Sequence, residues 1–345
     1  QYSFSPSVSV TTDVTNLSYS SASGSVTSSS SYVGGLIGAV NGSVFDNLSA
    51  SGVVLQNAGS RAGGLIGSFS TFYNNWNGNN YGGKLTNSSA TSNVTGGTSG
   101  YTGGLIGETS GTSISSSNAT GIVTGKGNYV GGLVGYSGTP ISTSNATGDV
   151  TNTSSYTGGL VGVSNASISD SYASGIVSGS ASYTGGLVGQ STAAITSSHA
   201  LGAVIATGAN SERVGGLVGY STSTVTDSYA TGSVSGAGVS ASRMGGLIGY
   251  SSSGNVLNSY ASGVVTGSGG SSYYIGGLVG SLDSATVSDS SYITGSVSGA
   301  SYVGGLVGVT NSSAVIKGSY TARPVTGTLD YVGGLVGKLA GTVQA

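Results

Sequence analysis

Residues 214–221 read Val-Gly-Gly-Leu-Val-Gly-Tyr-Ser, and this stretch decides the fold because its core recurs along the chain. The core is the five-residue sequence Gly-Gly-Leu-(Val/Ile)-Gly. A second stretch follows, as in 224–232 (Thr-Val-Thr-Asp-Ser-Tyr-Ala-Thr-Gly), and then a third, as in 233–236 (Ser-Val-Ser-Gly). Successive cores begin 27 to 31 residues apart, except for one interval of 40. The eleven cores begin at Gly34, Gly63, Gly103, Gly131, Gly158, Gly185, Gly215, Gly245, Gly276, Gly304 and Gly333.

Each unit thus holds three short β-prone stretches separated by Gly/Ser turns, a pattern typical of one coil of a solenoid. Val, Ile, Thr and Tyr suit a pleated surface, whereas frequent Gly and Ser oppose a helix. We therefore predict an all-β protein, a parallel β-solenoid (β-helix-like) of about eleven coils of about 27–31 residues each. Residues 1–345 are expected to form one array without globular caps.

The core itself indicates a strand that is covered on both faces. Side chains alternate along a strand, so Tyr302 and Leu306 are expected to point one way, and Val303 and Val307 the other. Both faces are apolar, which is typical of a strand buried on both sides. The glycines would form ladders that let another layer approach closely.

The core, followed by Ser-Tyr-Ala-Thr-Gly-x-Val, resembles the GLUG-motif repeat of bacterial and archaeal surface proteins. The resemblance extends from about residue 20 to the end. It implies a right-handed β-solenoid-like array in a secreted or cell-surface location. Such repeats occur in adhesins, autotransporter-like passengers and large surface proteases, so the resemblance transfers no catalytic residue and no cofactor.

Composition excludes several classes of protein. Charged residues make up 5% of the 345 residues, the net charge is −2, and 21 tyrosines accompany 37% hydrophobic residues, which favours ordered sheet over disorder. There is no cysteine, and no apolar run approaches the roughly 20 residues that span a bilayer. Eight dispersed Lys and Arg residues provide no basic stripe for nucleic acid. A start at Gln1 suits a mature chain whose signal peptide was removed.

The two ends of the array predict self-assembly. The N-terminal part (1–33) reads as the second half of a unit and the C-terminal part (333–345) as the first half of another. Solenoids normally carry polar caps, and open β edges in complementary register add to one another head to tail. We expect a homopolymer formed in an amyloid-like cross-β manner.

Candidate catalytic groups have plainer interpretations. The only histidine, His199, aligns with the tyrosines of the Ser-Tyr-Ala stretches, which predicts a place in a stacking column. Asp170 and Asp227 share a column with Ser197 and Asn258, so like charges stay out of adjacent coils. Asp289 is a further candidate for this column, but the extra residue at Ser290-Ser291 leaves its alignment open. Clustered carboxylates for glycoside cleavage, a calcium repeat and a Walker pattern are all missing, so we predict neither enzyme nor metal site.

The interval of 40 residues marks an insertion at 68–84, rich in aromatic residues and asparagine. It is expected either to contact glycans or a neighbouring subunit, or to fold onto its own coil. The aromatic residues that we assign to it are Phe69, Phe72, Tyr73, Trp76 and Tyr81.

Ten Asn-x-Ser/Thr sequons are candidate glycosylation sites, which would supply the solubility that charges do not. They are Asn16, Asn41, Asn47, Asn87, Asn93, Asn118, Asn145, Asn152, Asn165 and Asn311.

Three functions remain, none of them enzymatic. The first is a structural subunit of a self-assembling extracellular fibre or cell-surface sheath. The second is an adhesin stalk or binding module whose insertion meets cell-surface glycans. The third is an ice-binding solenoid, which needs a regular Thr-x-Thr ladder, whereas Thr and Ser interchange freely here.

Overall fold

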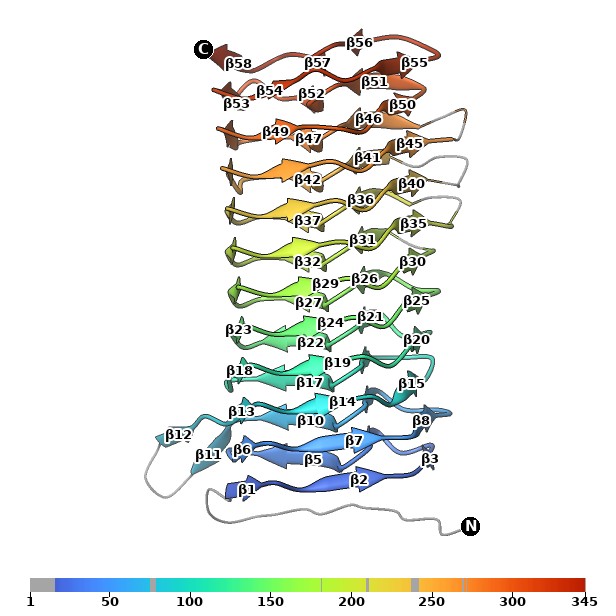
Figure 1. Ribbon diagram of the computed structural model, residues 1–345, viewed down its shortest axis with the longest axis vertical. Coiled ribbons are helices and arrows are strands. Elements are labelled where there is room, and N and C mark those ends of the chain that lie inside the picture. The colour runs from blue at the N-terminus through green and yellow to red at the C-terminus, as the bar shows by residue number, and fades with distance from the viewer. Residues whose placement is uncertain are drawn as a thin grey trace.

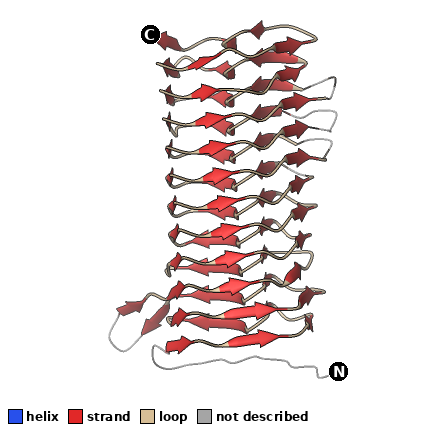
Figure 2. Cartoon of the chain, viewed as in Figure 1, coloured by secondary structure: helices blue, strands red, loops and turns tan. Residues whose placement is uncertain are grey.

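The chain folds as a parallel β-solenoid, seen from the side in Figure 1. The computed structural model describes residues 16–74, 79–180, 182–208, 211–236, 242–268, 270 and 272–344. All the regular structure in these ranges is β, and no helix occurs among them (Figure 2). Strands at equivalent places in successive coils pair in parallel, so the coils stack into five long sheets, here named A to E in the order in which the chain visits them. The prediction of an all-β solenoid of about eleven coils is confirmed.

Sheet A has twelve strands, and β1 opens coil 1. They are β1 (Asn16–Ser18), β6 (Val44–Asp46), β13 (Lys84–Thr86), β18 (Ile114–Ser115), β23 (Ile141–Ser142), β28 (Ile168–Ser169), β33 (Ile195–Thr196), β38 (Val225–Thr226), β43 (Val256–Leu257), β48 (Thr286–Ser288), β53 (Val315–Lys317) and β58 (Thr342–Gln344).

Sheets B and C have eleven strands each. Sheet B consists of β2 (Ser21–Ser23), β7 (Ser49–Ser51), β14 (Ser89–Ala90), β19 (Asn118–Ala119), β24 (Asn145–Ala146), β29 (Tyr172–Ala173), β34 (His199–Ala200), β39 (Tyr229–Ala230), β44 (Tyr260–Ala261), β49 (Ser291–Tyr292) and β54 (Tyr320–Thr321). Sheet C consists of β3 (Val26–Ser28), β8 (Val53–Gln56), β15 (Asn93–Thr95), β20 (Val123–Gly125), β25 (Val150–Asn152), β30 (Val177–Gly179), β35 (Val204–Ala206), β40 (Val234–Gly236), β45 (Val265–Gly267), β50 (Val297–Gly299) and β55 (Val325–Gly327).

Sheets D and E also have eleven strands each. Sheet D consists of β4 (Tyr32–Gly34), β9 (Arg61–Gly63), β16 (Tyr101–Gly103), β21 (Tyr129–Gly131), β26 (Tyr156–Gly158), β31 (Tyr183–Gly185), β36 (Arg213–Gly215), β41 (Ser242–Gly245), β46 (Tyr273–Gly276), β51 (Ser301–Gly304) and β56 (Val332–Gly333). Sheet E consists of β5 (Ile37–Asn41), β10 (Ile66–Ser70), β17 (Ile106–Ser110), β22 (Val134–Gly138), β27 (Val161–Ser164), β32 (Val188–Ser191), β37 (Val218–Ser221), β42 (Ile248–Ser251), β47 (Val279–Leu282), β52 (Val307–Thr310) and β57 (Val336–Lys338).

A coil therefore contains five short strands, where the sequence pattern suggested three stretches. The expectation that the core is one strand covered on both faces is wrong, because the chain bends at the Gly-Gly-Leu segment. The strand β51 ends at Gly304 and β52 begins at Val307, so the core forms the corner between sheets D and E. The bend lets the consecutive residues Leu306 and Val307 both point inward and become fully buried.

The three glycines of the core have separate steric reasons, which coil 4 illustrates. A β-carbon on Gly131 would come closer than 3.0 Å to the carbonyl oxygen of Val134 within the corner. One on Gly132 would come equally close to the carbonyl oxygen of Gly159 in the next coil. One on Gly135 would meet the backbone of both sheet E and sheet D in the preceding coil, at Gly107 and Thr102. Close approach of backbone thus explains the repeated glycines, as the sequence predicts.

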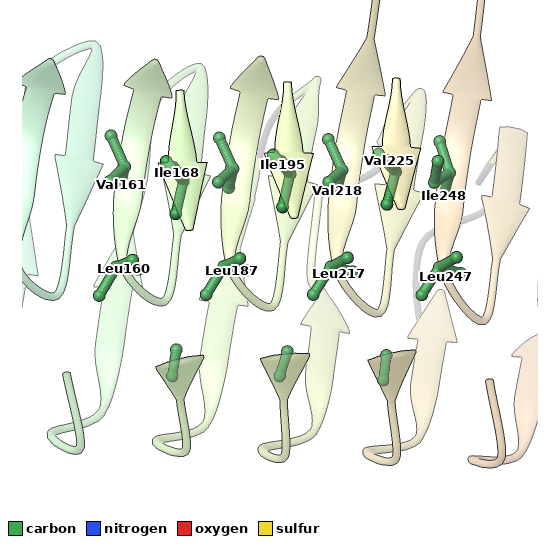
Figure 3. Packing of buried hydrophobic residues seen from close by; sticks show 14 of the residues in the cluster. Leu160, Val161, Ile168, Leu187, Ile195, Leu217, Val218, Val225, Leu247 and Ile248 are labelled. Atoms are coloured by element: carbon green, nitrogen blue, oxygen red, sulfur yellow. The ribbon is translucent and has the colours of Figure 1, made fainter. Parts of the chain in front are cut away.

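The main hydrophobic core runs the length of the solenoid as columns of like residues. Figure 3 shows one such column in which Leu160, Leu187, Leu217 and Leu247 follow one another from coil to coil. The Val or Ile that follows each of these leucines stacks in the same way, opposite the inward residue of sheet A. Smaller clusters, such as Val123 with its neighbours in sheets C and D, fill the space between those two sheets. Each apolar residue is covered by its equivalents above and below.

The described array begins and ends in sheet A. Residues 16–41 form a complete coil, and β58 adds a twelfth strand to sheet A after eleven coils of five strands. The two ends were expected to be complementary half units. Among the described residues, the first strand and the last strand both belong to sheet A.

Candidate functional site

The aspartates that the sequence singles out occupy a backbone turn. Asp170, Asp227 and Asp289 each follow a sheet A strand with φ of 49°, 50° and 50°. Ser197 and Asn258 have φ of 48° in the coils between them, and Gly318 takes the same place in coil 11 with φ of 54°. Asp, Asn and Gly tolerate this left-handed conformation better than other residues do.

This column gives the aspartates a conformational role. It also settles the alignment of Asp289, which pairs with this column because Ser288 lies in register with Leu257. Among the described residues, no three His, Cys, Asp or Glu side chains gather closely enough to hold a metal ion. Within the same ranges there is no helix with the length and hydropathy needed to cross a bilayer.

His199 lies in an aromatic stack on the outer face of sheet B, and the prediction of a stacking column is confirmed. Its imidazole ring lies 5.1 Å from the ring of Tyr172 and 4.7 Å from that of Tyr229, tilted by 3° and 2°. Tyr260 continues the stack at 4.9 Å. Partial burial lowers the pKa of His199 below its ordinary value, because desolvation penalises the charged imidazolium.

A longer strip of tyrosine and arginine runs along the junction of sheets D and E. Every copy of the core has Tyr or Arg two residues before its first glycine, and these residues are in mutual contact along most of the solenoid. The strip consists of Tyr32, Arg61, Tyr101, Tyr129, Tyr156, Tyr183, Arg213, Arg243, Tyr274, Tyr302 and Tyr331. This regular feature was missed in the sequence, although its fixed distance from the glycine was a sufficient signal.

Ring stacking and cation–π contacts join the members of the strip. The rings of Tyr129 and Tyr156 are 5.1 Å apart, and those of Tyr156 and Tyr183 are 4.5 Å apart. The guanidinium of Arg213 lies 4.6 Å above the Tyr183 ring. Arg61 is held between the rings of two tyrosines and forms an ion pair with Glu108 of sheet E.

The geometry of the strip limits what it can bind. Rings stacked along the axis cover one another's faces and turn their edges outward, so the faces that stack on sugars are already occupied. The strip is also tied to sheet E, because the guanidinium groups of Arg213 and Arg243 lie 5.7 Å and 5.2 Å from the ring of Tyr250, a sheet E residue whose hydroxyl donates to Asp283 at 2.5 Å. Burial, together with this hydrogen bond to Asp283, raises the pKa of Tyr250 to about 12. We therefore interpret the strip as a brace between coils.

The insertion at 68–84 contains a two-stranded antiparallel hairpin of β11 (Phe72–Asn74) and β12 (Asn79–Tyr81), which projects sideways from the stack in Figure 1. Phe72 pairs with Tyr81 and Tyr73 with Asn80 in the hairpin ladder. Trp76 lies outside the described residues.

Phe69 is placed in the core by the structure, although the sequence assigned it to the contact surface of the insertion. It belongs to β10 and is fully buried, with its ring 5.3 Å from that of Phe45. Its side chain is therefore not available to a ligand or a neighbouring subunit.

The ten sequons differ in accessibility. Asn152 is buried, and its side-chain amide donates to the carbonyl oxygen of Tyr156, so it cannot accept a glycan in the folded protein. Asn118, Asn145 and Asn311 are half-buried. The exposed sequon residues are Asn16, Asn41, Asn47, Asn87, Asn93 and Asn165.

The outward column of sheet C bears on ice binding. Thr95, Thr124 and Thr151 occupy it in coils 3 to 5, but Leu55 and Ile205 stand there in coils 2 and 7. The neighbouring outward positions, such as Val53, Asn93 and Ile122, are not threonine, so the described coils offer no paired ranks of Thr. It gives little support to an ice-binding surface.

Comparison with known families identifies the repeat. The model of the GLUG motif matches residues 126–151 and 210–235. The chain carries GLUG-motif repeats. Each match covers a single GLUG coil, running from sheet D through the Gly-Gly-Leu corner and sheets E, A and B into sheet C. No curated protein and no solved structure was found to match the chain.

Proposed function

We propose that this GLUG-repeat chain is a structural subunit of a self-assembling extracellular fibre or cell-surface sheath. It polymerises when the sheets of one copy continue into those of the next, in an amyloid-like cross-β manner. One observation supports the proposal: within the described residues, columns that are buried in the inner coils become half-buried or exposed in the first and last coils, whose strands have a partner on one side only.

The C-terminal edge illustrates this exposure. Val303 of sheet D and Ile316 of sheet A are buried in their coils, whereas their equivalents in the following strands, Val332 and Val343, are 45% and 43% exposed. The strands β54 to β58 have a partner strand on one side only. A further coil of the same pattern would cover these side chains and pair with the free backbone groups.

The N-terminal edge offers the matching columns. Leu17, Ala22 and Val26 are half-buried, although the residues paired with them in coil 2 are fully buried. The sheets of a second copy can therefore continue in register. Both ends carry a sheet A strand. The strand β53 of one copy can therefore pair either with its own β58 or with β1 of a second copy, but not with both.

That competition provides the first test. Removal of residues 342–345 would vacate the place beside β53, so we expect this variant to polymerise faster than the full chain. Assembly is followed by light scattering and electron microscopy, and fibre diffraction should show a reflection near about 4.8 Å along the fibre axis. A full chain and a truncated chain that both stay monomeric at high concentration would contradict the proposal.

An edge-blocking pair of variants provides the second test. Val332→Lys places a charge in a column that assembly would bury. No opposite charge would pair with it there, so we expect polymerisation to stop. Thr326→Lys adds the same charge to the same coil at an exposed position in the outward column of sheet C, which a further coil would not bury, so this control should still polymerise. Equal effects of the two substitutions would refute the stacking geometry.

The projecting hairpin supports a second candidate, an adhesin stalk or binding module that contacts cell-surface glycans. Phe72→Ala combined with Trp76→Ala would then abolish glycan binding, measured on immobilised polysaccharides, and leave polymerisation unchanged. Unchanged binding by this variant would remove the candidate.

A further inference from the structure

An exposed apolar ridge runs along the corner between sheets B and C. Each coil from 2 to 11 places one residue there, immediately before the first buried valine of sheet C. The ridge consists of Val53, Asn93, Ile122, Asp149, Ile176, Ala203, Ser233, Val264, Ser296 and Pro324.

The apolar members of the ridge are open to solvent. Val53, Ile122, Ile176 and Val264 are 43%, 50%, 45% and 44% exposed. Leu201, two residues before Ala203 in coil 7, is exposed beside them. Only Val44 and Tyr273 are further large apolar residues of this exposure among the described residues of coils 2 to 10. A row of exposed apolar residues at regular intervals on an otherwise Ser/Thr-rich surface is typical of an interaction site.

The polar members between them fold back along the ridge. The side-chain oxygen of Asn93 accepts a hydrogen bond from the amide of Ile122 at 2.9 Å. The carboxylate of Asp149 accepts one from the amide of Ile176 at 2.8 Å. These bonds hold the polar groups against the backbone of the next coil, so the isoleucines protrude between them.

The order of apolar and polar residues along the ridge is palindromic. From coil 2 to coil 6 the ridge reads apolar, polar, apolar, polar, apolar, and from coil 7 to coil 11 it reads the same. The order of residue types is therefore identical from either end of the ridge. A two-fold axis between coils 6 and 7 therefore pairs Ile122 with Val264, Ile176 with Ala203, and Asp149 with Ser233. Apolar meets apolar and polar meets polar at every position.

We propose that this ridge is a lateral interface between two copies of the chain, packed side by side and antiparallel. Self-complementarity under a two-fold axis is the requirement of an isologous interface. The centre of the face is its most apolar part, since Ile176, Leu201, Ala203 and the outward Ile205 cluster at the axis, and depletion of charge at the centre is a mark of interfaces. The interface lies on the side of the solenoid and is independent of end-to-end polymerisation.

The ridge is long and narrow, which sets the expected affinity. Nine coil steps of about 4.8 Å give a length of about 43 Å. A strip of this kind buries less than a standard interface, so we expect a reversible dimer in the micromolar range.

A charge-insertion experiment tests the surface. Ile176→Asp combined with Leu201→Asp brings four carboxylates to the axis of the pair, and we expect dimerisation to weaken at least about 100-fold in analytical ultracentrifugation. The matched control, Val44→Asp combined with Leu257→Asp, adds the same charge to sheet A and should dimerise like the parent. A parent chain that is monomeric at about 100 µM, or a ridge variant that dimerises normally, overturns the proposal.

Cysteine pairing tests the orientation, because the chain has no cysteine of its own. In the antiparallel pair, Ile122 faces Val264 of the second copy. A mixture of the Ile122→Cys and Val264→Cys variants should form a mixed disulfide on mild oxidation, whereas each variant alone should not. Disulfides within each variant alone would show parallel pairing, and their absence in the mixture would show no pairing; either result refutes the antiparallel interface.

Discussion

The amide of Ser144 donates to the side-chain oxygen of Ser171 in the following coil at 3.1 Å, and the Ser171 hydroxyl donates in turn to the carbonyl oxygen of Ser169 at 2.7 Å. The same two bonds recur at this corner between sheets A and B from coil to coil. They form a buried polar ladder beside the apolar columns. The ladder consists of Ser88, Ser117, Ser144, Ser171, Ser198, Ser228, Ser259, Ser290 and Ser319.

Removing one rung of this ladder should be costly. Ser171→Ala leaves the buried amide of Ser144 without its acceptor, so we expect a loss of about 1–3 kcal/mol in unfolding free energy. The loss is measured as a shift of the midpoint in denaturant unfolding. Ser169→Ala changes a half-buried outward hydroxyl two residues away and should stay within about 0.5 kcal/mol of the parent. A Ser171→Ala midpoint equal to that of the control would contradict the ladder.

The glycines of the core should be irreplaceable even by alanine. A β-carbon at Gly132 would overlap the carbonyl oxygen of Gly159, which belongs to a rigid ladder and cannot move away. We expect Gly132→Ala to lower the unfolding free energy by about 3 kcal/mol or more. At Gly138 the nearest atom to a new β-carbon is 3.4 Å away, so Gly138→Ala is the matched control. It should be neutral or slightly stabilising, because it reduces the entropy of the unfolded chain.

The aspartate column offers a test that separates conformation from charge. Asp227 has φ of 50°, a conformation that glycine adopts freely and alanine does not. We expect Asp227→Gly to be neutral or stabilising and Asp227→Ala to cost about 1 kcal/mol, as measured by thermal unfolding. If the carboxylate itself were needed, the two substitutions would harm stability or function equally.

The single histidine makes a pH test unambiguous. Desolvation lowers the pKa of His199 in the folded chain, so the unfolded chain binds a proton more readily. Stability should therefore be highest above the unfolded pKa of about 6.5 and should fall as the pH drops through that value. His199→Tyr restores the residue found in the neighbouring coils and should remove this part of the pH dependence. An NMR titration that places the folded pKa above about 6.5 would contradict the assignment.

The repeat allowed the solenoid, the number of coils and the columns of His199 and the aspartates to be predicted. Spacing alone aligns equivalent residues, and parallel stacking then puts equivalent residues in contact. The five strands per coil could not be predicted in this way. Strands of two to five residues, mostly joined by corners of two or three residues, are too short to leave a period of two in the sequence.

Tyr292 shows a second limit of sequence alignment. The extra residue Ser291 takes the outward place of Tyr260, so Tyr292 moves to the inward place of Ala261 and becomes fully buried. Its hydroxyl donates to the carbonyl oxygen of Gly263 at 2.8 Å, and burial raises its pKa well above the usual value. Reading the Ser-Tyr motif by type places this ring outside the coil, because a shift by one residue reverses the face of a strand.

The column arrangement has a consequence for how such a protein changes in length. Coil 5 runs from Ile141 to Ser167, and its removal would join Pro140 to Ile168, which occupies the same place in coil 6 as Ile141 does in coil 5. In every column, equivalent residues of the two flanking coils would then become direct neighbours. Recombination between repeats can therefore lengthen or shorten the rod in whole coils without disturbing any neighbour. An insertion must be accommodated at a corner between strands, as the hairpin between β10 and β13 is. A single residue gained or lost within a strand would instead reverse which of its side chains point inward.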